Sequence, residues 1–137
     1  MRSAYAFAAL AALIALGAPA AAEEVDCTDP QTQTLLNLCA AADHDAADER
    51  LNPLYAKVRE RLAGDERKLG LLRDAQRAWI GYRDAECAFQ ASTVEGGSAQ
   101  PMVASQCLAD QTTRRAADLD AYLACEEGDL ACPLPPQ

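Results

Sequence analysis

The sequence is short of the residues that most often carry catalysis. Its one histidine, His44, stands between Asp43 and Asp45. A nucleophile–base pair needs a histidine or a substitute, and we interpret His44 as a solvated helix-face residue rather than as a base oriented by an acid. The sequence has no phosphate loop or dinucleotide fingerprint. Its 21 acids allow many carboxylate pairs, but nothing marks two as the opposed pair of a glycosidase. We therefore predict that the protein is not an enzyme.

Metal-binding spacings are also lacking. The two closest of the six cysteines, Cys125 and Cys132, are seven residues apart, and no Cys-x-x-Cys or Cys/His motif occurs. Structural zinc sites are built from such close pairs. We therefore expect neither a metal nor another cofactor.

No apolar run is long enough to span a membrane. The longest, Ala4 to Leu16, falls below the roughly 20 residues that a spanning helix needs. It follows Arg2 and precedes Ala20-Ala21-Ala22, which is the pattern of a secretory signal cleaved before Glu23. Cleavage after Ala20 and retention as an anchor are the alternatives. We expect residues 1–22 to be a signal peptide, and residues 23–137 to be one exported domain, periplasmic or secreted, without membrane insertion.

Basic residues are the minority, with 12 Lys and Arg against 21 acids. Without the signal, which holds Arg2 and no acid, the net charge is (12 − 1) − 21 = −10. Such a domain will not bind nucleic acid or an anionic membrane by electrostatics. The negative charge either attracts a cationic protein or only keeps the domain soluble.

Apolar residues recur at three- and four-residue steps, as in amphipathic helices. The first predicted helix covers residues 31–62, capped by Asp29 or Thr28 with Pro30 at its first position. Proline inside a helix costs about 3 kcal/mol, so either this helix kinks at Pro53 or a second one starts there with Asn52 as its cap. The apolar stripe continues in phase across the proline, which favours one kinked helix.

Asp65 is a suitable cap for a second helix over residues 66–92, and Pro101 opens a third that should stop near Gly128. Residues 94–100 have the composition of a loop, and residues 126–137 should form an irregular tail. The fold class is therefore all-α, a small antiparallel three-helix bundle with its core in residues 27–125.

Six cysteines in a short exported chain indicate three disulfides. The helix order favours the sequential pairs Cys27–Cys39, Cys87–Cys107 and Cys125–Cys132. In the alternative, Cys27 or Cys132 crosses to another helix.

One segment carries a family resemblance. Residues 75–87, AQRAWIGYRDAEC, resemble the signature of the LprI-like lysozyme-inhibitor family. Further matches are the N-terminal cysteine pair, a DxxLNxxY element, a GGS stretch followed by cysteine, and a TxxR element. The matching signature residues are Asp48, Leu51, Asn52, Tyr55, Gln76, Trp79, Tyr82, Arg83, Asp84, Thr112 and Arg115. Pro53 and the Cys125/Cys132 pair depart from the family pattern.

The resemblance implies a mostly helical envelope protein and, for some members, inhibition of lysozyme by protein binding. A basic lysozyme is the expected cationic partner. The alternatives are a general periplasmic interaction module and a cell-wall hydrolase, and the oligomeric state is left open. The exposed loop of Glu95, Gly96, Gly97, Ser98 and Gln100 is the expected docking element.

The signature residues admit two interpretations. In the structural one, Trp79 packs between helices, Arg83 pairs with an acid such as Asp48, and Gln76 bonds Asn52, because a buried arginine must be paired. In the functional one, tryptophan, arginine and tyrosine form an exposed binding face. We favour the structural interpretation.

Overall fold

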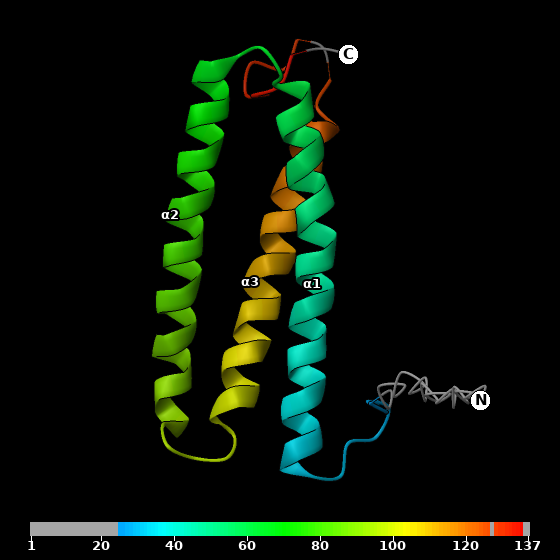
Figure 1. The fold of residues 1–137 in the computed structure, drawn as a ribbon, viewed down its shortest axis with the longest axis vertical. Helices are drawn as coiled ribbons and strands as arrows, with labels where there is room; N and C mark the ends of the chain where they lie inside the picture. Colours follow the sequence, from blue (N-terminus) through cyan, green and yellow to red (C-terminus); the bar gives the residue numbers. More distant parts are fainter. Residues whose placement is uncertain (1–24, 127, 136–137) are drawn as a thin grey trace, which may run out of the picture.

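The computed structural model describes residues 25–126 and 128–135, so the predicted signal peptide and its cleavage site lie outside it. Three helices follow one another: α1 (Gln33–Arg61), α2 (Glu66–Ala91) and α3 (Gln100–Leu123), with the short 3-10 helix η1 (Ser92–Val94) after α2. Consecutive helices run antiparallel, so that α1 and α3 point the same way (Figure 1), and the described residues contain no strand. The all-α three-helix prediction is confirmed. None of the described helices is long and apolar enough to cross a membrane.

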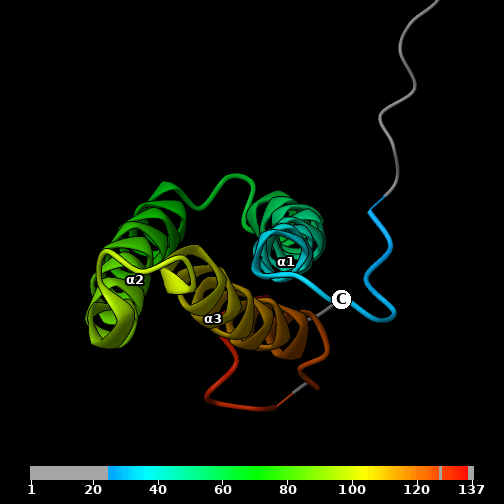
Figure 2. The same cartoon turned by 90° about the horizontal axis from the view of Figure 1, so that it is seen from below.

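Helix α3 lies between the other two helices (Figure 1). It packs extensively on α1 and less extensively on α2, while α1 and α2 stand mostly apart, as the view along the bundle shows (Figure 2). We call the end that carries residues 92–99 the loop end. The opposite end, with the 62–65 turn and residues 124–135, is the tail end.

Helix α1 begins later than predicted, and its cap is Thr32 rather than Asp29 or Thr28. The Thr32 hydroxyl accepts a hydrogen bond from the Leu35 N–H at 3.2 Å, which satisfies one of the free N–H groups of the first turn. The helix runs through Pro53 without interruption, so the one-helix interpretation is right. Pro53 and Glu49, whose carbonyl loses its helical partner, are both exposed, so water can reach that carbonyl.

Helix α2 starts at the predicted cap: the Asp65 carboxylate accepts a bond from the Lys68 N–H at 2.9 Å. Helix α3 ends at Leu123, earlier than the predicted stop near Gly128. The chain has to reverse there, because Cys132 joins Cys125 at a Cα–Cα distance of 5.8 Å. A continuous helix would put these residues roughly 10 Å apart.

The hydrophobic core belongs mainly to α1, α3 and the tail. Its buried members are Leu51, Val58, Leu62, Ala116, Leu119 and Leu134. Helix α2 adds Leu69, Leu72 and Trp79 to this cluster, and all three are only partly buried. Helix α2 is therefore the least embedded of the three.

Three disulfides join the same pairs that the cysteine order favours, namely Cys27–Cys39, Cys87–Cys107 and Cys125–Cys132. No cysteine of the described residues is free.

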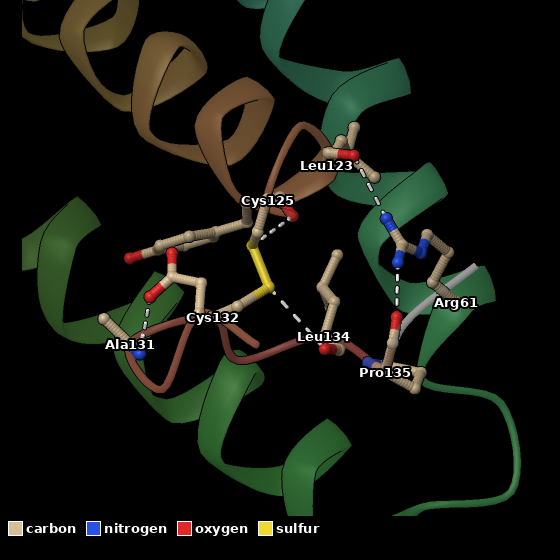
Figure 3. Close-up of a disulfide and its surroundings, with 9 residues drawn as sticks. Arg61, Leu123, Cys125, Ala131, Cys132, Leu134 and Pro135 are labelled. Carbon is tan, nitrogen blue, oxygen red and sulfur yellow. Dashed lines mark hydrogen bonds between the residues drawn. A yellow bond between two sulfur atoms is a disulfide. The ribbon is translucent and has the colours of Figure 1, made fainter. Parts of the chain in front are cut away.

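The described residues of the C-terminal tail form no helix or strand, and they fold back onto the bundle. Arg61 donates hydrogen bonds to the carbonyls of Leu123, at 3.1 Å, and Pro135 (Figure 3). Leu134, between this arginine and the Cys125–Cys132 bridge, is only 5% exposed. The tail thus covers the apolar tail end of the bundle.

Candidate functional site

A polar pair stands in the seam between α2 and α3. The Arg115 Nε donates to the Gln76 Oε1 at 3.0 Å, and Gln76 is 8% exposed. The predicted bond from Gln76 to Asn52 is wrong, because Asn52 is exposed on α1 and Arg115 occupies the Gln76 amide oxygen. Gln76 therefore acts as an acceptor for a nearly buried guanidinium, which fits the structural interpretation.

Arg83 makes a second group of polar contacts, on the side of α2 that faces α1. Its guanidinium lies 3.9 Å from the carboxylate of Asp48, the predicted partner, and 2.9 Å from that of Asp84, its chain neighbour. It also stands 5.0 Å from the centre of the Trp79 ring, within the range of a cation–π contact. The Arg83 side chain is only 15% exposed, so these partners offset the loss of water.

The other signature residues divide between interior and surface. Leu51 and Thr112 are buried, and Tyr55 packs against the core. The exposed members are Asn52, Tyr82 and Asp84. Most of the signature residues are thus buried or half-buried, whereas Tyr82 is a large side chain that faces outward and is 57% exposed.

His44 is not the solvated residue that the sequence suggested. It follows Ala40 by four residues and precedes Ala47 by three, so it shares their inward-facing stripe. Its Nε2 is enclosed and, within the described structure, has no hydrogen-bond partner. We therefore assign His44 to the helix packing, not to an active site.

The residues of the predicted docking loop form a short, well-bonded connection at the loop end. The Gly96 N–H donates to the Gln100 Oε1 at 2.9 Å, and the Gly97 N–H donates to the Val94 carbonyl at 3.0 Å. Gly96 has φ +74°, which disfavours any residue with a side chain. The loop is therefore ordered by both backbone and side-chain hydrogen bonds within it.

Two further contacts tie this loop to the helices. The Asn37 side chain on α1 donates to the Ser98 carbonyl at 3.0 Å. The Cys87–Cys107 bridge joins the end of α2 to the start of α3. Glu95, Gly96, Gly97 and Ser98 remain exposed, whereas Gln100 is half-buried. The loop is therefore both accessible and preorganised.

Charge is distributed unevenly along the bundle. The loop-end half comprises residues 25–47, 79–99 and 100–111. Its acids are Asp26, Asp29, Asp43, Asp45, Asp84, Glu86, Glu95 and Asp110. These eight acids face a single Lys or Arg, namely Arg83, which is already paired. All except Glu86, which is half-buried, are exposed. In the described tail-end half, ten acids stand against ten bases, so the negative field is concentrated at the loop end.

Two large aromatic side chains are exposed on α2 in the same half. Phe89 is 74% exposed and Tyr82 is 57% exposed. They are seven residues apart, two turns of helix, and so share one face. This face differs from the one that carries Gln76, Trp79 and Arg83 into the seam.

An apolar cleft of about 310 Å³ opens at the tail end. Its lining includes Leu62 of the turn after α1, Leu71 and Leu72 of α2, Tyr122 of α3 and Leu134 of the tail. Among the residues that the structure describes, no group of three or more metal-ligating side chains converges. Most of the cleft lining is apolar, and Arg67, Lys68 and Arg115 also border it.

Comparison with known proteins agrees with this scaffold. The model of the family described as lysozyme inhibitor LprI matches residues 26–119, which include the first two disulfides and nearly all of the helical bundle. An uncharacterized protein of Rhizobium meliloti (strain 1021) is 39% identical over 132 residues, which cover 87% of this chain and 95% of that protein. No solved structure matches significantly. The chain belongs to the lysozyme inhibitor LprI family.

Proposed function

We propose that this protein is exported to the cell envelope and inhibits a lysozyme by binding it, without catalysing a reaction. The observation that carries the proposal is the family match over residues 26–119. That range spans the whole bundle up to Leu119 of α3, so it includes the scaffold and the loop together.

Export is supported by the cysteine chemistry. Three disulfides in a short chain are typical of oxidising compartments such as the periplasm or the exterior. The signal-like residues 1–22 agree with this placement. The expected mature protein is therefore a disulfide-bonded helical bundle that stays folded outside the cytoplasm.

Electrostatics supports binding to a lysozyme. Lysozymes cleave glycosides with two carboxylates in a cleft, and many carry a strongly basic surface outside it. The acidic loop-end half would attract such a surface at long range and accelerate association. Residues Glu95 to Gln100 are the element best suited to enter the cleft, because they are exposed and already ordered. Preorganisation reduces the entropy lost on binding.

A turbidity assay of lysozyme on bacterial cell walls tests the proposal. The purified mature domain is expected to slow clearing at micromolar excess, and more strongly at low than at moderate salt. The same domain reduced and alkylated at its cysteines serves as the control and should lose inhibition. Undiminished clearing by lysozymes of several classes would contradict the proposal, and clearing by the domain alone would favour a cell-wall hydrolase.

A general periplasmic interaction module is the second candidate. The apolar cleft at the tail end favours it, because about 310 Å³ bordered by leucines suits an apolar side chain or short peptide. Pull-down of a periplasmic protein, with no lysozyme binding, and loss of that protein on substitution of Leu71 would support this function instead.

A further inference from the structure

We infer that the outer face of α2 at the loop end, centred on Tyr82 and Phe89 with Glu86 beside them, is the surface on which a cationic protein docks. The inference rests on the proposed function, in which that partner is a basic lysozyme. It adds a second binding element, an aromatic helix face, to the loop.

The face is apolar and has no partner within the described chain. Tyr82, Ala85 and Phe89 follow one another at steps of three and four residues, so they lie in one row along α2. All three are exposed. The side chains that α2 presents to the rest of the bundle, such as Gln76 and Cys87, belong to a different row and are buried. The row therefore contributes little to the fold.

Aromatic residues in this setting are the usual anchors of protein interfaces. Tyrosine and other aromatics are enriched at hot spots and interface centres, where they bury a large area with few rotatable bonds. Phe89 comes two residues after Cys87, whose bridge to Cys107 fixes the end of α2. Phe89 is thus held on a rigid support, so a partner would pay little ordering entropy to bind it.

The surrounding charge selects a cationic partner rather than a second copy of this chain. Glu86 lies one helical turn from both Tyr82 and Phe89, and Glu95 follows in the adjoining loop. The only base of this half is Arg83, which is engaged with Asp84 and Asp48. Two such surfaces would repel each other, whereas a surface rich in lysine and arginine would be attracted.

Alanine substitution of the aromatic side chains tests the inference. The affinity of the mature domain for a basic c-type lysozyme is measured by biolayer interferometry for the wild type and for Tyr82→Ala and Phe89→Ala. Each variant is expected to bind about tenfold more weakly or worse, mainly through faster dissociation. Ile80→Ala is the matched control, because Ile80 is a 39%-exposed apolar residue of the same helix outside this row. Circular-dichroism melting should show that all three variants remain folded.

Neutralising the acids tests the charge argument separately. The double variant Glu86→Gln/Glu95→Gln should associate several-fold more slowly at low salt, and the difference should shrink at high salt. Glu60→Gln, in the balanced half, is the control and should behave as the wild type.

The possible failures can be told apart. A wild-type domain that binds no lysozyme would reject the proposed function and this surface with it. Wild-type binding that both aromatic variants retain in full would overturn the inference about α2 alone.

Discussion

Arg115 on α3 and Gln76 on α2 share a hydrogen bond of 3.0 Å between Nε and Oε1. The bond crosses the seam between the two helices, and both side chains are nearly buried, at 11% exposure for the Arg115 side chain and 8% for Gln76. It therefore links α2 to a helix pair with which it shares little hydrophobic core.

Gln76→Ala should remove the acceptor and leave the Arg115 Nε–H in the seam without a protein partner. The free energy of unfolding is expected to fall by about 1–3 kcal/mol, the usual cost of a buried unsatisfied donor. Urea unfolding followed by circular dichroism measures it. Gln90→Ala, which removes an exposed bond to Glu86, is the control and should change stability by less than about 0.5 kcal/mol. Equal effects of the two substitutions would contradict the role given to Gln76.

Arg83→Ala should alter the environment of Trp79. The guanidinium lies 5.0 Å from the indole ring, and its removal should admit water to that face. Because Trp79 is the only tryptophan, intrinsic fluorescence reports on it directly and should shift to longer wavelength. The exposed Arg77 of the same helix provides the control: Arg77→Ala should leave the emission unchanged. An unshifted spectrum for the Arg83 variant would argue against the contact.

The disulfides should differ in their contributions to stability according to the loops that they close. Replacing Cys87 and Cys107 by serine opens a loop with a sequence separation of 20 and is expected to cost about 3 kcal/mol. Replacing Cys125 and Cys132 opens a separation of 7 and should cost about 2 kcal/mol. Thermal unfolding of the two double variants should preserve this order, and a reversed order would mean that packing around Leu134 outweighs loop length.

The lead-in before α1 should respond to acid. The Asp26 carboxylate accepts bonds from the Thr28 N–H at 3.0 Å and the Thr28 hydroxyl at 2.7 Å, which lower the pKa of Asp26. Because the pKa is lowered, the ionised carboxylate stabilises this turn at pH values above the ordinary carboxyl pKa. That stabilisation is lost as the pH falls through the lowered pKa. Carboxyl NMR titration should therefore give a higher pKa for Asp26 in Thr28→Ala. The same substitution at the exposed Thr34 should have no effect.

The helix content and the order of the cysteines could be predicted because both depend on local spacing. Asp65 caps α2 as its sequence position suggests, and the apolar stripe carries α1 through Pro53. The cap of α1 was missed because Asp29, Thr28 and Thr32 are all acceptable caps. The choice among them depends on the path of the lead-in toward the Cys27–Cys39 bridge.

The partner of Gln76 could not be predicted from spacing. Whether Gln76 meets Asn52 of α1 or Arg115 of α3 depends on how α2 is oriented toward the other two helices, and both options satisfy its periodicity. The burial of Leu134 was missed for a similar reason, since a proline-rich tail signals irregular backbone but not where that backbone packs. The exposure of Tyr82 and Phe89 likewise depends on the tertiary structure, because they belong to a second apolar row of α2 that no other described helix covers.

Helix α2 is attached at both ends, by the 62–65 turn and by the Cys87–Cys107 bridge, while its sides bury little. A helix that is attached mainly at its ends can bend or rotate between them more easily than a helix that is buried along its length. Amide hydrogens in the middle of α2 should consequently exchange with solvent before those of α1 and α3. The middle of the helix least committed to the core can thus move relative to α1 and α3, while its loop end, beside the Cys87–Cys107 bridge, stays fixed.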